Sequence, residues 1–138
     1  MSNRTFTIIK PDSVRKGNFG KIISRLENEG FRILGLKKVF LSRRQAEGFY
    51  AVHKERPFFG SLVEYMTSGP VYVAALERDG AVAHLRQVMG ATDPAKADAN
   101  TIRKEFGESI EQNAIHGSDS DENAKIEIGF FFAESELV

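Results

Sequence analysis

Two hydrophobic periods alternate along this chain, and that alternation limits its fold more than any other feature. Thr5–Ile9 alternates in polarity and is rich in β-branched residues, which predicts a strand. In the next segment apolar residues recur at the i, i+3, i+4 and i+7 spacing of a helix: Phe19, Ile22, Ile23 and Leu26. Gly30 suits the position just past the end of that helix. Because strands and helices continue to alternate, we expect an α/β or α+β sandwich in which helices cover a sheet.

Helix-capping residues and prolines mark the boundaries of further helices and strands in the rest of the chain. Strands are expected at residues 31–41 and 71–76, and helices after Ser42, near Pro57, near Val82 and near Ala124. Ser42-Arg43-Arg44-Gln45 has capping-box spacing, and Pro57 suits the first turn of its helix. Residues 90–118 read mostly as loop, with one short helical piece around Thr101–Phe106. A long irregular segment inside a compact domain is usually functional.

Bulk composition narrows the class of protein. A chain of 138 residues is normally one domain, here residues 1–138, with enough length to bury a core. Lys plus Arg equals Asp plus Glu at 19 each, which argues against a general polyanion or nucleic-acid binder. The absence of cysteine excludes disulfides and thiol catalysis. Neither a signal-peptide core nor a bilayer-spanning apolar run occurs, so we expect a cytoplasmic protein without a membrane partner.

One histidine stands in an unusual setting. Asn113-Ala114-Ile115-His116-Gly117-Ser118-Asp119 puts an imidazole in what reads as a small-residue turn just before a helix start. Such a histidine can be a nucleophile, a proton shuttle, a metal ligand or a cap. His53 and His84 lie on or beside amphipathic stripes and are interpreted as structural or surface residues. The three histidines lack metal-ligand spacing, which disfavours a histidine metal site.

Other residues interrupt the apolar pattern. Arg86 and Glu127 occupy places in helical stripes where apolar residues are expected, so both should point toward the interior or its margin. The plain alternative is burial of the side-chain stem with the charge reaching water. Phe58 lies about 100° from the core-facing Phe59 on a helix and faces something else. It is either an ordinary, partly exposed aromatic or a platform for a flat ligand.

The common glycine-rich phosphate-binding loops are missing from this sequence. Lys10 at a strand end, Arg86 on a helix and Arg103 beside the long loop can still clamp a triphosphate through charge-assisted hydrogen bonds. Each of these cations taken alone is more typical of a solvated surface.

Five motifs together resemble the nucleoside diphosphate kinase family. They are Thr7-Ile8-Ile9-Lys10-Pro11-Asp12, Arg56-Pro57-Phe58-Phe59, Ser68-Gly69-Pro70-Val71, Thr101-Ile102-Arg103 and Asn113-Ala114-Ile115-His116-Gly117-Ser118-Asp119. Their order and spacing match the family throughout, and the last is the specific one. The resemblance implies an α+β, ferredoxin-like α/β sandwich whose four-stranded antiparallel sheet is covered by helices. It also implies reversible ping-pong transfer of a γ-phosphoryl group between nucleoside triphosphates and diphosphates.

The resemblance also implies roles for individual residues. His116 becomes a pros-phosphohistidine, with the phosphate on Nδ1. The other residues it places in catalysis are Lys10, Tyr50, Asn113, Ser118 and Glu127. Those that bind the nucleotide are Lys10, Phe58, Arg86, Thr92, Arg103, Ile110 and Asn113, with Phe58 and Ile110 on either side of the base. Mg²⁺ is the expected cofactor, held by the nucleotide phosphates and by no protein ligand, with ATP as the main donor.

Histidine chemistry fits such a reaction. A phosphoramidate keeps the transfer potential that a serine phosphate ester would lose, so the cycle stays reversible. A neutral imidazole must attack, and its other nitrogen needs a partner that fixes the tautomer. We expect Glu127 to be that partner, directly or through the region of Ser118. If a helix begins after Gly117, its positive end further favours the neutral ring and then the phosphoryl anion.

Two further classes remain open at the level of sequence. One is a non-catalytic nucleotide- or nucleic-acid-binding module, since ferredoxin-like sheets often bind RNA. The other is a histidine-phosphotransfer protein, which needs no base platform.

The family forms homo-oligomers built from dimers. Glu134, near the aromatic triplet 130–132, would be costly to bury at a second interface unless paired. A dimer is therefore favoured over a tetramer.

Overall fold

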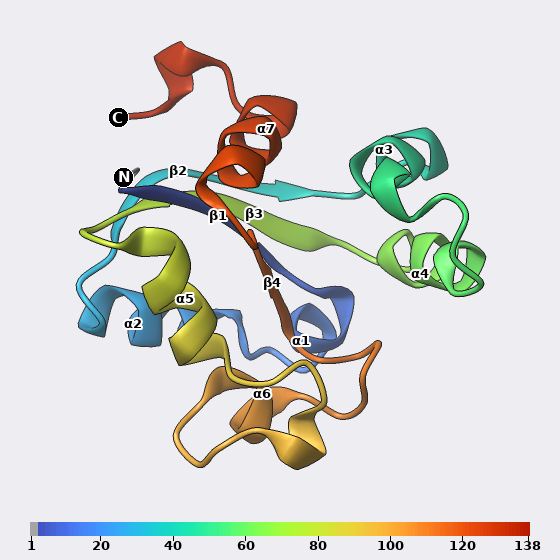
Figure 1. Cartoon of the computed structure of the whole chain (residues 1–138), viewed down its shortest axis with the longest axis horizontal. Coiled ribbons are helices and arrows are strands. Elements are labelled where there is room, and N and C mark those ends of the chain that lie inside the picture. Colours follow the sequence, from blue (N-terminus) through green and yellow to red (C-terminus); the bar gives the residue numbers. More distant parts are fainter. Residues whose placement is uncertain (1–2) are drawn as a thin grey trace.

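A four-stranded antiparallel sheet forms the centre of the molecule in the computed structural model, which describes residues 3–138 (Figure 1). The strands are β1 (Arg4–Ile9), β2 (Arg32–Val39), β3 (Val71–Glu77) and β4 (Ile115–Gly117), in the order β2-β3-β1-β4. The α-helices are α1 (Pro11–Arg15), α2 (Phe19–Asn28), α3 (Arg43–Phe49), α4 (Phe59–Met66), α5 (Ala81–Met89), α6 (Ile102–Phe106) and α7 (Asp121–Phe131). Short 3₁₀ turns cover Ala51–His53, Pro94–Lys96 and Glu134–Glu136. The predicted ferredoxin-like α+β sandwich is confirmed.

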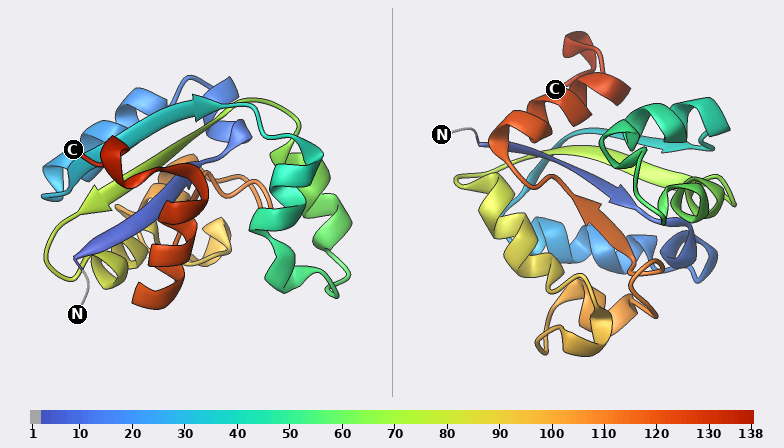
Figure 2. Two further views of the ribbon diagram at one scale, coloured as in Figure 1. Left: turned by 90° about the horizontal axis from the view of Figure 1, so that it is seen from above. Right: turned by 45° about the vertical axis from the view of Figure 1, so that its right-hand side comes forward.

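The period-two pattern of β1 and β3 builds a core on each face of the sheet. Phe6, Ile8 and Val73 belong to one buried cluster, which includes side chains of α3, α4 and α7. The neighbouring Ile9 and Ala74 belong to the other cluster, formed with α2, α5 and α6. Figure 2 shows α7 on one face, α2 and α5 on the other, and the α3–α4 pair extending beyond one end of the sheet.

Local sequence signals fix several element ends. Ser42 accepts a hydrogen bond from the Gln45 amide while the Gln45 side chain accepts one from the Ser42 amide, so the capping box is confirmed. Gly30 has a φ of 88° just past α2, where its amide donates to the Glu27 carbonyl and the next amide, of Phe31, donates to that of Leu26. This is the two-bond helix ending that favours glycine.

Other boundaries differ from the sequence-based prediction. The helix expected near Pro57 begins two residues later, at Phe59, so Pro57 lies outside its first turn. The helix that opens at Ser42 ends at Phe49, and the chain continues through the 3₁₀ turn Ala51–His53. Pro11-Asp12 opens the short helix α1, because proline is well accommodated in a first helical turn.

His116 lies in a strand, and its predicted location in a turn is wrong. β4 is an edge strand of three residues that pairs with Thr7, Ile8 and Ile9 of β1. A segment of three residues is too short to show a hydrophobic period. It is a strand because it pairs with a distant strand. Gly117 permits the close approach of α5, since a Cβ there would lie 2.6 Å from Met89 Sδ. Helix α7 begins at Asp121, capped by Ser120, and not directly after Gly117.

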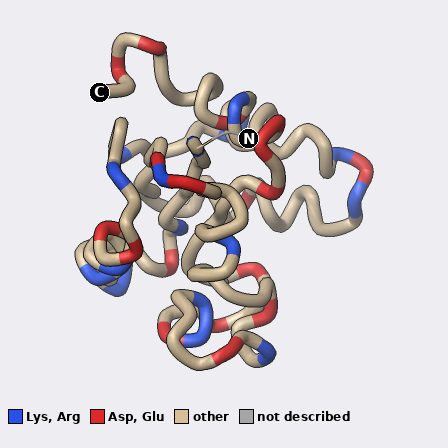
Figure 3. Tube along the Cα trace, turned by 60° about the vertical axis from the view of Figure 1, so that its left-hand side comes forward, with Lys and Arg blue, Asp and Glu red and all other residues tan. Residues whose placement is uncertain are grey.

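Charge is distributed evenly over the trace. Figure 3 shows Lys and Arg interspersed with Asp and Glu along the chain, in agreement with the equal numbers of the two kinds. Among the helices of residues 3–138, none is both long and apolar enough to cross a bilayer.

Candidate active site

The strand register aims His116 at the α3–α7 side of the sheet. His116 pairs with Ile8, so its side chain shares the face of Ile8 and Phe6. The imidazole centroid lies 6.3 Å from the ring of Phe6, 5.5 Å from that of Phe49 and 6.4 Å from that of Tyr50, all edge-on. Its side chain is 22% exposed. The ring is therefore held by aromatic walls yet remains open to a ligand.

Glu127 orients the imidazole. One of its carboxylate oxygens, Oε1, lies 2.9 Å from His116 Nε2 and accepts a hydrogen bond of 2.8 Å from Ser118 Oγ. An ionised carboxylate only accepts, so in the neutral ring the proton lies on Nε2 and the lone pair on Nδ1. No hydrogen bond to Nδ1 occurs among residues 3–138. The charged residue that interrupts the α7 stripe thus lies at the interior margin and sets the tautomer.

The Tyr50 side chain packs edge-on against the His116 ring. Its hydroxyl is buried and has no hydrogen-bond partner within residues 3–138. Burial, and then the negative charge of Glu127, raise the pKa of Tyr50 well above its usual value. The phenol therefore stays protonated next to the His116 ring.

Lys10 and Asn113 join the end of β1 to the start of β4. The buried Lys10 Nζ donates to Asn113 Oδ1 at 2.7 Å and to the Glu111 carbonyl at 3.4 Å. Asn113 Nδ2 in turn donates to the Thr92 carbonyl at 3.0 Å. Three segments that lie far apart in sequence thus meet through one ammonium and one amide.

Arg103 adds a second buried cation. Its Nη1 donates to the Gly90 carbonyl at 3.2 Å and its Nη2 to the Ile115 carbonyl at 2.8 Å. Its Nε is buried and has no partner within residues 3–138. An unpaired buried donor on a guanidinium is costly unless a ligand completes it.

The cations of the site repel one another. Burial, and then the charge of Arg103, lower the pKa of Lys10 to about 8, although Asp12 and Glu111 oppose the shift. Burial, and then the charge of Arg86, lower the pKa of Arg103 to about 10. Such mutual destabilisation at a single place is typical of a site that receives an anion.

Arg86 reaches this cluster from the surface, so the prediction that it points inward is wrong. The buried stripe of α5 consists of Ala81, Val82, Leu85, Val88 and Met89. Arg86 follows Leu85 by one residue, about 100° around the helix, and is exposed. Its charge still acts on Arg103.

Three other residues predicted to bind the nucleotide are exposed to solvent. The Phe58 side chain is 47% exposed, that of Ile110 is 62% exposed, and Thr92 is exposed as well. Ser61 Oγ, one turn along α4 from Phe58, donates to Glu111 Oε2 at 2.8 Å. Because Glu111 follows Ile110, this bond brings together the two segments that carry the apolar side chains.

Sequence reasoning missed a buried pair beside the site. Asp12 is 1% exposed and accepts a hydrogen bond from the hydroxyl of Tyr65, which comes from α4. Asp12 follows a proline in the first turn of α1 and reads as a helix-start residue. Its partner is 53 positions away, so no local signal exists.

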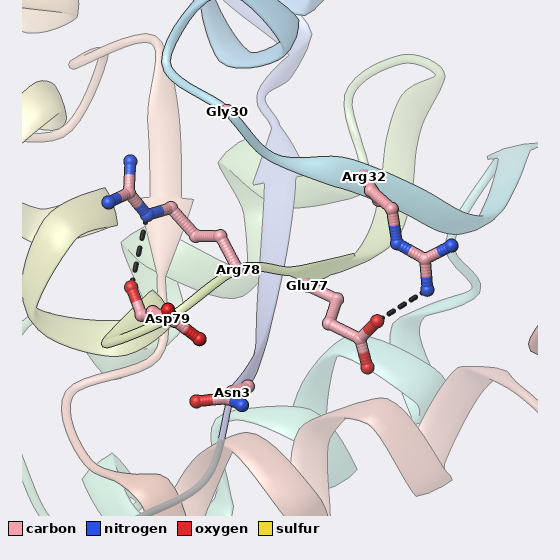
Figure 4. Close-up of a pocket in the computed structure, with 6 residues that line it drawn as sticks. All are labelled: Asn3, Gly30, Arg32, Glu77, Arg78 and Asp79. Carbon is pink, nitrogen blue, oxygen red and sulfur yellow. Dashed lines mark hydrogen bonds and ion pairs between the residues drawn. The ribbon is translucent and has the colours of Figure 1, made fainter.

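A second hollow lies at the opposite end of β1, β2 and β3 (Figure 4). Its lining residues are Asn3, Gly30, Arg32, Glu77, Arg78 and Asp79. Arg32 pairs with Glu77, and Arg78 Nε donates to the Asp79 carbonyl at 3.0 Å. The Arg32 and Glu77 charges of this hollow pair with each other and Arg78 donates to backbone carbonyls, whereas the Arg103 Nε of the His116 site has no partner within residues 3–138.

The chain is similar to known proteins over nearly its whole length. The nucleoside diphosphate kinase family profile matches residues 3–137. A Campylobacter jejuni protein named nucleoside diphosphate kinase is 62% identical over 134 residues, 97% of this chain and 98% of that protein. The Aquifex aeolicus nucleoside diphosphate kinase superposes with a TM-score of 0.97 at 46% identity and full coverage of both chains.

A third relative was solved with a nucleotide. It is the halophilic nucleoside diphosphate kinase of Halobacterium salinarum in complex with CDP, with a TM-score of 0.95 at 41% identity. The match covers 100% of this chain and 92% of that one. With a family profile over nearly its whole length and relatives of high identity, the chain belongs to the nucleoside diphosphate kinase family.

Proposed function

We propose that His116 is the nucleophile of the nucleoside diphosphate kinase reaction and that its Nδ1 carries the phosphoryl group. The protein, as a member of this family, moves a γ-phosphoryl group from a nucleoside triphosphate to a nucleoside diphosphate. One observation supports the assignment above all. Glu127 occupies Nε2 of His116, so the lone pair of Nδ1 is free. The buried cations Lys10 and Arg103 bind Asn113 and Ile115, the residues just before His116.

The reaction has two balanced half-steps. Nδ1 of His116 attacks the γ-phosphorus of the triphosphate, the N–P bond forms, and the bond from phosphorus to the β,γ-bridging oxygen breaks. The diphosphate leaves with that electron pair. The Nε2 proton stays in its hydrogen bond to Glu127, whose charge offsets the positive charge that develops on the ring. An acceptor diphosphate then attacks phosphorus, the N–P bond breaks, and His116 is regenerated.

The cations are proposed to hold the transferred group. Lys10, Arg103 and Arg86 supply positive charge around phosphates, and the free Nε of Arg103 is a ready donor. Asn113 and Thr92 add polar contacts to phosphate or ribose. Phosphoryl transfer needs little beyond positioning and charge neutralisation, and this set is the chain's own contribution to both.

We expect Mg²⁺ to enter with the nucleotide. The groups proposed to contact the phosphates are an ammonium, guanidiniums and an amide, which attract phosphate and are not Mg²⁺ ligands. Phosphate oxygens are good Mg²⁺ ligands and would carry the ion in as part of the substrate. ATP is the expected main donor.

Phe58 and Ile110 are proposed to enclose the base. Both are exposed apolar side chains on segments joined by the bond between Ser61 and Glu111. Contact with the flat face of a base does not read its edge, so we expect the site to accept several bases.

The assembly and location of the protein are proposals as well. We propose one domain, residues 1–138, that forms a cytoplasmic homo-oligomer, with a dimer favoured over a tetramer. Glu134 is highly exposed, and its ion pair with Arg4 of the same chain is long at 3.8 Å, so burial at a second interface would remove two weakly paired charges from water. Light scattering of wild type and Glu134→Ala tests this preference, and a tetramer in both proteins would contradict it.

One assay distinguishes the kinase from the other two classes. The protein is incubated with γ-labelled Mg·ATP, and a diphosphate is then added. We expect acid-labile, alkali-stable label on His116 that passes to the diphosphate. Label that does not pass would indicate a phosphotransfer protein, and no label would leave only a binding module; either result contradicts the proposal.

A further inference from the structure

Ala114, two residues before His116, holds an unusual backbone conformation. Its φ is 75°, in the left-handed region, and its methyl group is fully buried. The Ile115 amide donates to the Asn113 carbonyl at 2.9 Å, which closes a three-residue turn around Ala114. A γ-turn with positive φ at its centre is rare, and strained for a residue with a Cβ. Surrounding contacts must therefore hold it.

Both backbone polar groups of Ala114 are held by the segment that follows β1. The Ala114 amide donates to Asp12 Oδ2 at 3.1 Å. The Ala114 carbonyl accepts from the Lys10 amide at 2.9 Å. On one side of this turn Asn113 contacts the Lys10 ammonium, and on the other His116 lies in β4.

Asp12 is itself fixed. Its Oδ1 accepts a hydrogen bond from the Tyr65 hydroxyl, and its amide donates to the same hydroxyl oxygen at 2.9 Å. Burial, and then the bond to Asp12, raise the pKa of Tyr65, so the phenol remains a donor. A side chain whose two oxygens are used and whose exposure is 1% has little freedom to move.

We infer that Asp12, supported by Tyr65, is a positioning residue for phosphoryl transfer that holds the strained turn at Ala114 and so sets His116 and Asn113 relative to Lys10. The inference rests on the proposed role of His116 as nucleophile. Asp12 acts through Ala114 and touches no substrate.

Asp12 also contributes charge to the site. Arg103 lowers the pKa of Lys10, whereas Asp12 and Glu111 raise it. Loss of the Asp12 charge would therefore shift the pKa of Lys10 further down, and the cationic form would disappear at a lower pH. A residue that only stabilises the fold would not move this pH dependence.

The test measures phosphorylation of His116 by Mg·ATP in single turnovers, across pH, in Asp12→Asn. We expect the rate to fall by about ten- to a hundredfold, in the range that small misplacements of reacting groups cost. The alkaline limb of the profile should move to lower pH. Asp79→Asn is the matched control, because it makes the same change at an exposed turn residue and should leave the rate unchanged.

Relief of the strain provides a rescue. Glycine adopts positive φ freely, so Ala114→Gly should recover much of the rate lost in Asp12→Asn and change wild type by less than about twofold. Tyr65→Phe loosens the carboxylate but keeps its charge, and should lower the rate less without moving the alkaline limb. If Asp12→Asn does not fold, the same rescue is measured in Tyr65→Phe.

The outcomes separate the inference from the proposed function. Wild type that acquires no label on His116 contradicts the function itself. Wild type that labels while Asp12→Asn labels equally fast, with the same pH profile, contradicts only the inference. A rate that Ala114→Gly fails to restore in both the Asp12→Asn and the Tyr65→Phe backgrounds also contradicts it.

Discussion

The site has a fixed inner half and an open outer half. Lys10, Arg103 and Asn113 of the inner half are each buried and hydrogen-bonded to a strand end or to the loop before it. Phe58 and Ile110 of the outer half are exposed and are joined only indirectly, through Ser61 and Glu111. The buried groups assigned to the phosphates are thus preorganised, whereas the exposed side chains assigned to the base are not.

Such a division suits an enzyme that treats one part of its substrates as constant and another as variable. The phosphates are the same in every nucleotide and reward a rigid set of charges, because fixed dipoles cost no reorganisation. The bases differ, and exposed apolar contacts accept them all. Substitutions in the inner half should therefore change rates strongly, and those in the outer half should change apparent affinity modestly.

The largest effect is expected from His116→Gln. Loss of the nucleophile should abolish the phosphoenzyme and lower turnover by about four orders of magnitude or more. Labelling with γ-labelled ATP and coupled turnover assays measure both quantities. His84→Gln is the control. His84 lies in α5, pairs with Glu29 just after α2 and has no proposed role in catalysis, so this variant should keep wild-type activity. Label retained in His116→Gln would place the chemistry elsewhere.

Lys10→Met comes next. We expect kcat/KM to fall roughly a hundred- to a thousandfold, since a preorganised charge on the phosphates is lost. For wild type, kcat/KM should decline as pH rises through about 8, where free Lys10 loses its proton. Lys21→Met, an exposed lysine of α2, should behave like wild type. An alkaline limb that survives unchanged in Lys10→Met would assign it to another group.

Lys10→Met should lower activity but raise the free energy of unfolding. The pKa of Lys10 drops from 10.5 to about 8 on folding, so between these values the unfolded chain binds the extra proton. Lys10 therefore destabilises the fold below pH 8, and this penalty disappears as pH rises toward 10.5. Urea unfolding should find Lys10→Met more stable than wild type at pH 7, with the difference shrinking at higher pH. A difference that grows with pH would contradict the cause given for the shift.

A smaller effect is expected from Glu127→Gln. The amide loses the charge that holds the Nε2 proton, and phosphorylation should slow by about ten- to a hundredfold with little loss of fold stability. Single-turnover labelling and the midpoint of urea unfolding measure the two quantities. Glu122→Gln on the exposed side of α7 is the control. Wild-type kinetics in Glu127→Gln would remove the carboxylate from the mechanism.

Phe58→Ala should have the smallest effect. Loss of one stacking surface should raise KM by roughly tenfold for every base and leave the phosphorylation rate at saturation nearly unchanged. Steady-state assays with purine and pyrimidine diphosphates check this, with the exposed Phe40→Ala as control. A variant that became base-selective while binding as tightly as wild type would contradict the platform role.

Local patterns predicted what depends on local physics. The capping box at Ser42, the helix ending at Gly30 and the alternation in β1 follow from neighbouring residues, and all three are confirmed. Strand β4 and the orientation of Arg86 were mispredicted. β4 exists because it pairs with β1, more than 100 positions earlier, and the exposed side of α5 depends on which residues α5 packs against.

The same distinction applies to the site. The interruption of the α7 stripe by Glu127 pointed to a buried polar role, because a carboxylate there needs a partner. Asp12 and Tyr65 gave no such signal, since an aspartate in a first helical turn and a tyrosine on an amphipathic helix are both ordinary. Their importance arises from a contact with Ala114 that only the folded chain contains.

The position of the phosphoryl group on the imidazole tests the central claim most directly. Phosphorus NMR of the enzyme, phosphorylated with Mg·ATP and then unfolded in alkali, distinguishes the two phosphohistidine isomers. Because Glu127 holds the Nε2 proton of His116, the phosphate is expected on Nδ1. Phosphate on Nε2, or on a residue other than His116, would contradict the account.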